Sequence, residues 1–482
     1  MKSFSLHTIF SALLLFAMTS PLQARPKSKD DVGIKWLDSH FEVLDSISKS
    51  IHAFAEPGYQ EYRSSAMLIA FLEENGFKVE KGVAGIPTAF VASFGSGKPV
   101  IGIAAEYDAL PGLSQAVVPY RQSVEEDGYG HGCGHNLLGT GSVAAAVAIS
   151  KWLSLGNSGT VKLFGCPAEE GGGAKNYMAR DGVFDGLDAA FIWHPSTRNR
   201  TNLNTGSATM TIDFTFKGKG AHAGAQPWNG RSAMDAVEAL DYMYNMMREH
   251  VRPETRIHYA LTRTNPAPNV VPELSTVRYY VRHPDVAYMR EVAERVIKAA
   301  EGAALGTGTV MSYELINGNY PVLANAVLCD IVCRKQNEVG GVLLDEGEKD
   351  FCRELLKNSG RDPEDFGNFA AVDPEVSPNR PTGGSSDAGS LSLCAPTAKL
   401  YVACCTLGGG GHCWQQVALG GTTIGTKAVV NVGKIYYLTA LELYRKPELL
   451  KAATEEFLKA RGKDFKYESL VGDRKPPLDY RK

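Results

Sequence analysis

Strand-like and helix-like segments alternate along the first half of this sequence. The expected strands cover residues 88–94, 100–105, 160–166 and 189–193, and the expected helices cover residues 32–54, 64–75, 138–152 and 174–181. The strands are short apolar runs, whereas the helices are longer and carry apolar residues at helical spacing. Since strands that alternate with helices usually pair in parallel, the pattern predicts an α/β fold with a largely parallel sheet flanked by helices.

The order of the elements changes between residues 208 and 312. A strand (210–216), a helix (232–248), two strands (257–262 and 275–281) and a second helix (286–304) follow one another here. This order predicts a small α+β domain, an antiparallel sheet backed by two helices, inserted into the larger one. The main domain is then expected in two parts, residues 25–207 and 313–482. Its second part contains helices at 324–335, 346–357 and 423–444, a strand at 400–405 and a loop at 367–385.

Length and charge narrow the class of function. At 482 residues the chain is too long for one ordinary domain, and 44% hydrophobic with 21% charged residues is the balance of a folded protein. A formal net charge of -3 offers no basic face of the size that nucleic-acid binding needs. We therefore expect a small-molecule substrate and no nucleic-acid partner.

The first 24 residues differ in character from the rest of the chain. Lys2 precedes an apolar run at residues 9–18, and the small residue Ala24 is followed by a basic segment. The run is too short to anchor the chain in a bilayer, whereas Ala24 suits the last position before signal cleavage. We expect residues 1–24 to be an export signal peptide, which implies a periplasmic location in a bacterial host. No later stretch is apolar enough to span a membrane.

A cluster of potential metal ligands lies in the stretch Gly130–Gly141, G-H-G-C-G-H-N-L-L-G-T-G. Cys133 and His135 stand two residues apart, and the flanking glycines let the backbone come close to a bound ion. The stretch runs into an Ala/Val-rich helix, so the pair is expected at a loop-to-helix junction, where active-site residues of α/β proteins lie. Taken alone, the pair is equally compatible with structural packing.

Polar residues follow the expected strands at their carboxyl ends. They are Glu106-Tyr107-Asp108, Glu169-Glu170 and His194. In parallel sheets these ends meet at one edge, where function collects.

The remaining cysteines do not form an obvious disulfide framework. Nine cysteines occur in all, and committing Cys133 to a metal leaves eight that are scattered over the chain. Although an exported protein favours pairing, Cys404-Cys405 lies in an apolar strand and is typical of core filling. We expect mostly free, buried thiols.

Seven motifs together resemble a known family. They are E-Y-D-A-L-P-G, G-H-G-C-G-H-N-L-L-G-T, C-P-A-E-E-G-G-G, W-H-P, G-K-G-A-H-A-G, P-N-V-V-P and G-H-C-W-Q. Their order and spacing are similar to those of the dinuclear metallopeptidases that include aminoacylases, bacterial carboxypeptidases and auxin-conjugate amidohydrolases. The similarity extends over nearly the whole mature length. The chain resembles the amidohydrolase branch, because it has Glu106-Tyr107-Asp108 where aminoacylases have His-x-Asp and it gains Cys133 and His135.

The resemblance implies a site for two divalent metal ions, Zn, Mn or Co. The implied ligands are Cys133, His135, Glu170, His194 and His412. Imidazole, carboxylate and thiolate donors suit such ions. Without the resemblance, His194 is interpreted as a structural residue and His412 as a solvated loop residue.

The resemblance also assigns roles to the neighbouring carboxylates. Glu169 is expected to act as the general base, which takes a proton from a metal-bridged hydroxide or water and passes it to the leaving nitrogen. Asp108 is expected behind the metals, where it orients a ligand. Glu106 is not expected to be a ligand, and the role of Asp387 is left unassigned.

Residues of the inserted domain complete the implied site. His222 resembles the family's lid histidine, which donates to the developing oxyanion in the active site of the other protomer. Asn269 is similar to the residue that holds a substrate carboxylate or carbonyl. Arg231 and Arg282 are candidates for carboxylate recognition, with solvated or helix-supporting roles as alternatives. A homodimer is implied, and the strand at 210–216 is expected to offer an edge to the second copy. A related second subunit stays open.

These features predict a metal-dependent amidohydrolase that cleaves the amide bond of an N-acyl or N-aroyl amino acid. A dipeptidase or an N-acyl-amino-acid deacylase of the same family is one alternative. A non-catalytic metal-containing binding protein is another, although a binder has no need of Glu169 as a base.

Overall fold

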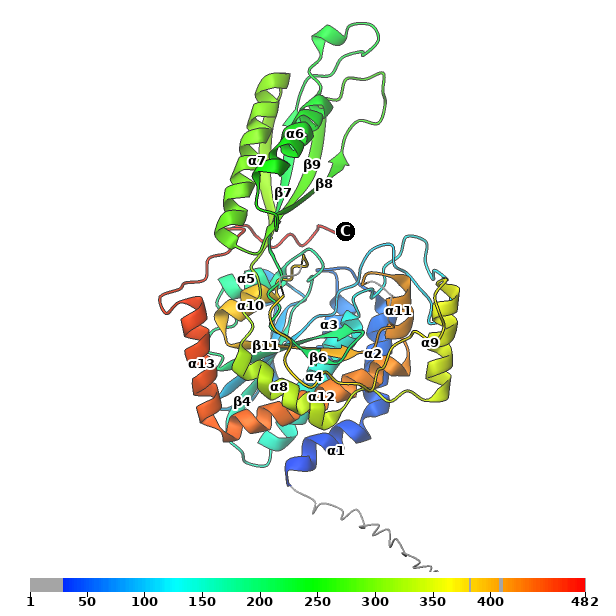
Figure 1. The fold of residues 1–482 in the computed structure, drawn as a ribbon, viewed down its shortest axis with the longest axis vertical. Helices are drawn as coiled ribbons and strands as arrows, with labels where there is room; N and C mark the ends of the chain where they lie inside the picture. Colours follow the sequence, from blue (N-terminus) through cyan, green and yellow to red (C-terminus); the bar gives the residue numbers. More distant parts are fainter. Residues whose placement is uncertain (1–28, 381–382, 407–410, 482) are drawn as a thin grey trace, which may run out of the picture.

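The computed structural model describes residues 29–380, 383–406 and 411–481. It shows a broad α/β main domain with a narrower inserted domain standing on one end of it (Figure 1). Two strands, β7 (Ala208–Lys217) and β10 (Val310–Asn319), lead into and out of the inserted domain. The expected export signal lies outside the described residues.

The main domain is built on a mostly parallel sheet. Its strands are β1 (Lys78–Lys81), β2 (Phe90–Ser96), β3 (Val100–Ala105), β4 (Gly159–Gly165), β5 (Ala189–Ser196), β6 (Arg200–Thr201) and β11 (Thr397–Ala403). They follow the order β1-β2-β4-β3-β5-β11-β6, in which β4, β3, β5 and β11 are parallel and the strands at both edges are antiparallel. The predicted α/β fold with a largely parallel sheet is confirmed.

Helices cover both faces of this sheet. One face carries α1 (Val32–Ser39), α2 (Phe41–Phe54), α3 (Tyr62–Glu74), α4 (His135–Leu153), α8 (Ala326–Val339), α9 (Glu346–Asn358), α11 (Trp414–Gly420), α12 (Thr423–Arg445) and α13 (Pro447–Arg461). The other carries α5 (Ala174–Arg180) and α10 (Ala388–Cys394). Side chains of β3 alternate between the two cores, with Ile101 and Ile103 in the larger and Ala104 in the smaller.

The inserted domain is an antiparallel sheet with two helices on one face. Its strand order is β10-β7-β9-β8, with β8 (Arg256–Arg263) and β9 (Leu274–His283), and its helices are α6 (Ala233–Met247) and α7 (Val286–Thr307). Ser232 and Asp285 cap the two helices, because each side chain accepts a hydrogen bond from a backbone N–H of the first turn. Apolar residues of both helices and the sheet form a separate core.

Two expectations about the inserted domain need correction. The strand expected to offer an open edge, 210–216, is β7, which pairs with β10 on one side and β9 on the other. The edge strands are β8 and β10. The sheet also continues to Asn319, beyond the expected boundary at residue 312, because β10 pairs with β7 along its length.

All nine cysteines are free thiols, as expected, and five of them are buried. Within the described ranges, none of the helices combines the length and the apolar character that a membrane crossing needs.

Candidate metal centre

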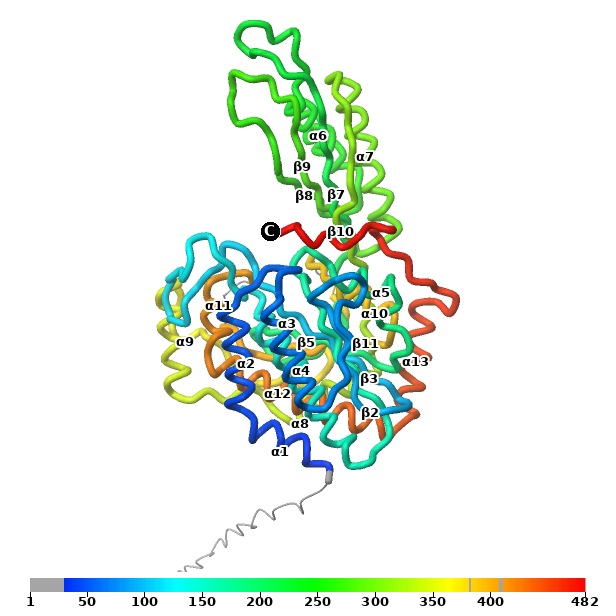
Figure 2. Tube along the Cα trace, turned by 180° about the vertical axis from the view of Figure 1, so that it is seen from behind, coloured from blue at the N-terminus to red at the C-terminus, as the bar shows by residue number. Residues whose placement is uncertain are grey.

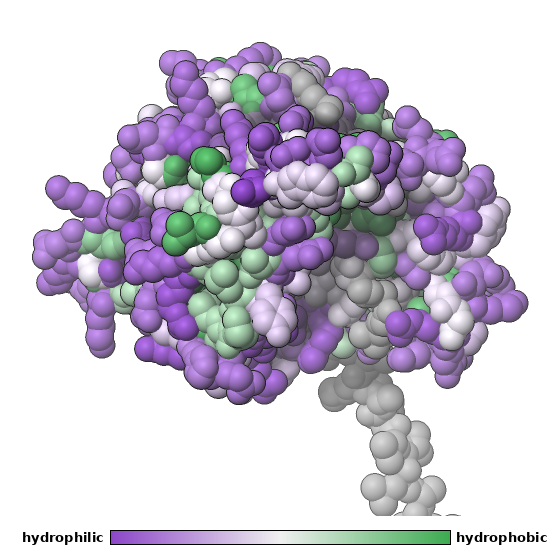
Figure 3. Space-filling view, turned by 90° about the horizontal axis from the view of Figure 1, so that it is seen from above, coloured by the Kyte–Doolittle hydropathy of each residue, from purple (hydrophilic) through white to green (hydrophobic). Residues whose placement is uncertain are grey.

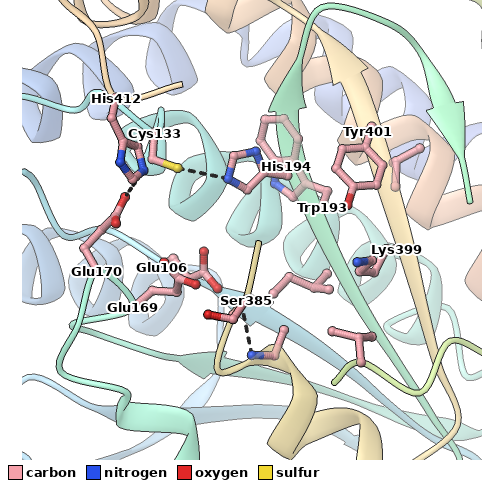
Figure 4. A pocket seen from close by; sticks show the side chains of 15 residues that line it. Glu106, Cys133, Glu169, Glu170, Trp193, His194, Ser385, Lys399, Tyr401 and His412 are labelled. Atoms are coloured by element: carbon pink, nitrogen blue, oxygen red, sulfur yellow. Dashed lines mark hydrogen bonds and ion pairs between the residues drawn. The ribbon is translucent and has the colours of Figure 1, made fainter. Parts of the chain in front are cut away.

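The five expected metal ligands come together at the carboxyl edge of the main sheet. Figure 4 shows Cys133 between His412 and His194, with Glu170 directed toward His412 and with Glu106 and Glu169 beside them. Different elements position the ligands: β4 leads to Glu170, β5 contains His194, and His135 begins α4. Parallel strands place their carboxyl ends together, which explains why residues far apart in the sequence meet here.

The backbone around the ligands adopts conformations that sheets and helices do not use. Gly134 has a φ of 77°, and a Cβ atom there would lie 2.8 Å from Pro195 Cγ, so the turn between Cys133 and α4 requires glycine. His412 has a φ of 59°, and its N–H donates to the carbonyl of Gly132 at 3.0 Å. Backbone strain of this kind concentrates at functional sites.

Two groups of the expected ligands share the sulfur of Cys133, and a third possible group contains Glu106, His135 and Glu169. The first group contains Cys133, His135 and His194, and the second contains Cys133, Glu170 and His412; the atoms within each group lie within 4.8 Å of one another. Cys133 Sγ is 3.2 Å from His194 Nε2, and His412 Nε2 is 3.2 Å from Glu170 Oε1. These two groups would supply the donors for two divalent ions, and Cys133 could contribute to either group.

Asp108 lies behind these ligands and contacts two of them. Its Oδ1 is 2.8 Å from His135 Nδ1, and its Oδ2 accepts a hydrogen bond from the backbone N–H of Glu170 at 2.9 Å. Burial alone would raise the pKa of Asp108, but the His135 imidazole holds it at about 2. The contact at Nδ1 leaves Nε2 of His135 directed at the ligand cluster.

The chemistry of the donors fits a pair of divalent cations. Nε2 of His135 is fully buried and, among the described residues, makes no hydrogen bond; its nearest carboxylate is Glu106, at 3.3 Å. Burial, Glu106 and Glu170 raise the pKa of Glu169 well above its usual value. Burial and Glu170 likewise raise the pKa of the Cys133 thiol. Crowded carboxyls and a thiol become stable anions only beside additional positive charge, which divalent ions would provide.

A buried lysine, overlooked in the sequence, supports the centre from the other side. Lys175 Nζ lies 2.7 Å from Glu106 Oε1 and 2.6 Å from Asp387 Oδ1, and all three side chains are almost fully buried. Glu106 Oε2 is in turn 3.3 Å from Nε2 of His135. Asp387, unassigned from the sequence, also accepts a hydrogen bond from the backbone N–H of Lys175. The available signal was weak: Lys175 is one of two basic residues in the short helix α5, and it stands in the first turn, whereas Arg180 ends the helix.

Glu61 is a second residue that sequence reasoning missed. This buried carboxylate accepts a hydrogen bond from the backbone N–H of Ala168 at 2.8 Å, and Ala168 has a φ of 53°. Glu61 thereby fixes the turn that presents Glu169 and Glu170.

The ligands open onto a cavity and a larger cleft. A cavity of about 210 Å³ is lined by Glu106, Cys133, Glu169, Glu170 and His194. It shares Glu169, Glu170, Ser385 and His412 with a cleft of about 780 Å³ between the two domains, which we call the interdomain cleft. The interdomain cleft is also lined by Arg282 of β9 and by Arg481.

The other candidates from the inserted domain lie elsewhere. His222 and Asn269 are exposed and line a separate cavity of about 390 Å³. Arg231 is also exposed, and its guanidinium donates to the carbonyls of Trp228 and Gly230. Of the residues expected in the inserted domain, only Arg282 shares a cleft with the metal ligands in this single chain.

Known proteins are similar to this chain in sequence and in fold. The profile described as "Peptidase family M20/M25/M40" matches residues 102–352. One of the subunits of the p-aminobenzoyl-glutamate hydrolase of Escherichia coli (strain K12) is 36% identical over 438 residues, which is 85% of this chain and 91% of that protein. The Xaa-Arg dipeptidase of Mus musculus is 28% identical over 87% of this chain and 90% of that protein.

A solved structure supports the same assignment at the level of the fold. A dinuclear metal-binding peptidase of the M20 family from Bacillus subtilis superposes with a TM-score of 0.51 at 18% identity, covering 83% of this chain and 98% of that one. Since the family profile spans more than half of the sequence and the E. coli relative most of it, this chain is a metal-dependent amidohydrolase that belongs to peptidase family M20/M25/M40.

Proposed function

We propose that this protein hydrolyses the amide bond of an N-aroyl or N-acyl amino acid, with p-aminobenzoyl-glutamate as the first candidate substrate. The candidate comes from the similarity to the E. coli hydrolase. The observation that carries the proposal is a cluster of five candidate ligands, four of which line the same cavity as Glu169, next to the interdomain cleft. A cleft of that size accommodates a ligand such as an aroyl amino acid.

Each residue of the centre has a defined task in this reaction. Cys133, His135, Glu170, His194 and His412 hold two divalent ions, for which Zn, Mn and Co are the candidates. When bound, these ions supply positive charge that lowers the pKa of water and polarises the scissile carbonyl. Glu169 takes the proton of the attacking water and delivers it to the leaving nitrogen. Asp108 keeps the His135 ring oriented.

In a homodimer formed through the inserted domain, His222 of one protomer would donate a hydrogen bond in the active site of the other. Nδ1 of His222 accepts hydrogen bonds from the N–H groups of Gly224 and Ala225, which leaves the proton on Nε2 as an outward donor. Strand β8 has an open edge with exposed Tyr259 and Leu261. Figure 3, which looks down on the inserted domain, shows apolar side chains grouped among polar ones on this end. The name of the E. coli relative describes one subunit of a hydrolase, so pairing with a related subunit is the other arrangement.

Export is part of the proposal. The basic start, the apolar run and Ala24 support removal of residues 1–24 on the way to the periplasm of a bacterial host. Mass spectrometry of the native protein should find the mature chain beginning near Arg25.

Purified, metal-loaded protein tested against a panel of amides decides between the candidate functions. The panel contains N-aroyl amino acids, N-acyl amino acids and Xaa-Arg dipeptides, and we expect the highest kcat/KM on an N-aroyl amino acid. A preference for dipeptides or for N-acyl amino acids would favour the dipeptidase or deacylase alternative. Full metal content without turnover of any member would favour a binding protein.

A further inference from the structure

The segment that follows α13, residues 462–481, contacts both domains. It crosses the junction between the two domains and runs beside β10, as both views show (Figures 1 and 2). We call it the C-terminal strap. No regular secondary structure is present in it, so side-chain contacts must define its path.

Those contacts attach the C-terminal strap to both domains. Leu470 is buried in the core of the inserted domain, and its neighbour Val471 is buried in the smaller core of the main domain. Arg474 then forms an ion pair of 2.8 Å with Glu314 of β10. Two adjacent residues in two different cores fix the strap at the hinge between the domains.

The last residues of the strap reach the metal centre. Tyr480 packs its ring against Tyr59, and a Cβ atom at Gly58 would lie 2.3 Å from the Tyr480 hydroxyl, so Gly58 makes room for this ring. Arg481 donates to the carbonyls of Ala109 at 3.2 Å and of the metal ligand Glu170 at 2.5 Å. Arg481 therefore forms part of the wall beside the ligands.

The cations of the interdomain cleft divide into paired and unpaired groups. Arg278 pairs with Asp213 at 2.7 Å, and Arg474 pairs with Glu314. In contrast, neither Arg282 nor Arg481 forms an ion pair within 4.0 Å with a carboxylate of the described ranges, although Arg481 lies near enough to Asp108 to help lower the pKa of that buried carboxyl. Nε of Arg282 is buried without a hydrogen-bond partner there, and burial lowers the pKa of this guanidinium. Partly buried cations without counter-charge are costly unless an anion binds them.

We propose that Arg481 of the C-terminal strap binds the α-carboxylate of the amino acid on the leaving side of the scissile amide. Arg481 touches a ligand-bearing residue, and the α-carboxylate is one carbon away from the scissile nitrogen, so the two fall at the same end of the cleft. Arg282, on the facing wall from β9, is the second unpaired cation and receives a second carboxylate where the amino acid is dicarboxylic. The strap thus selects anionic amino acids and repels cationic ones, such as the arginine of an Xaa-Arg dipeptide.

This inference rests on the proposed amidohydrolase function, and a comparison of two substrates tests it. The substrates are p-aminobenzoyl-glutamate and its analogue with the α-carboxylate converted to a carboxamide. For Arg481→Gln we expect kcat/KM on the diacid to fall about 10–100-fold through KM, because one charge-assisted contact is lost. On the carboxamide we expect a change of less than about threefold, and Arg481→Lys should recover part of the loss. Lys475→Gln, an exposed residue of the same strap, makes the matched charge change and should behave as the unmodified protein.

A binding measurement separates failure of this inference from failure of the proposed function. In metal-loaded Glu169→Gln protein, titration calorimetry with p-aminobenzoyl-glutamate should show weaker binding when Arg481→Gln is added, whatever the turnover of the parent. Equal losses on the diacid and the carboxamide, or an unchanged affinity, would overturn the role of Arg481. If the unmodified protein turns over none of the amides while Arg481→Gln still weakens binding, the reaction is wrong and the subsite stands.

Discussion

The metal centre and the His222 loop are expected parts of one active site, yet the chain builds them in opposite ways. At the metal centre, groups outside the ligand set hold several ligands in place, as Asp108 holds His135 and the carbonyl of Gly132 holds the backbone of His412. His222 is exposed, and its imidazole contacts only N–H groups of its own loop. The proposed ion ligands are thus brought together by a single chain, whereas the proposed oxyanion donor His222 is left open for a second copy or for domain motion.

Removing a ligand and removing the base should have the largest effects and should differ in kind. Cys133→Ala should lower bound metal and activity together, because Cys133 belongs to both ligand groups. Glu169→Gln should retain the metal and lose turnover by about two or more orders of magnitude. Metal analysis alongside steady-state rates measures both. A Cys133→Ala protein with unchanged metal content and an unchanged steady-state rate would contradict the ligand assignment.

A mixed dimer tests whether His222 completes the active site of a second copy of the chain. His222→Ala should lower kcat by about 10²–10³-fold, the range for losing an oxyanion donor. Co-expression with Glu169→Gln should restore activity, since crossed sites place both lesions in one active site and none in the other. Verified heterodimers that stay as inactive as their parents would show that His222 acts within its own chain.

The buried side of the metal centre should be sensitive to a residue that touches no substrate. Lys175→Met leaves Glu106 and Asp387 facing each other without their shared cation. We expect a loss of about 3–5 kcal/mol in the free energy of unfolding, measured by denaturant titration, and a metal affinity lowered about 10–100-fold. Lys151→Met is the control, because that partly buried lysine lies in the same domain and its ammonium donates to the Asn75 side-chain oxygen and lies over the Trp36 ring rather than between two carboxylates. Equal stability of the two variants would contradict a supporting role for Lys175.

The smallest effect is expected at the arginine that lies outside the interdomain cleft. Arg231 is exposed and donates only to carbonyl groups of its own loop. Arg231→Gln should therefore change kcat/KM by about twofold or less, which corresponds to about 0.5 kcal/mol or less. A loss comparable to that of His222→Ala would place Arg231 in the completed active site and weaken the contrast between the two regions.

The candidate ligands could be named from the sequence because seven motifs resemble those of a known family in order and spacing. Their own signals are weaker, since Cys133 and His135 share only one glycine-rich stretch and His194 and His412 are lone histidines. The residues around Lys175 carry no such signal. Lys175 and Asp387 are 212 positions apart, and no spacing rule links two isolated charges over that distance. Only the packing of α5 against α10 brings them together.

Other features of the fold were not predicted from the sequence, for different physical reasons. Strand β10 mixes polar and apolar residues and ends in Asn317-Gly318-Asn319, a sequence typical of a turn. The order of strands in a sheet is not contained in the periodicity of any one strand, so β7 was taken for an edge. For α13 the signal was available: Pro447 stands at its first position and its apolar residues recur at helical spacing.

The parallel pair of β5 and β11 has a consequence for how the chain reaches this fold. Thr397 of β11 pairs with Ala190 of β5, and the entire inserted domain is synthesised between these strands. The inserted domain has its own core and local pairings, so it can fold early, whereas the apolar edge of β5 waits for β11. A chain cut between residues 208 and 396 would expose this unpaired edge and aggregate, and would not yield a smaller active enzyme.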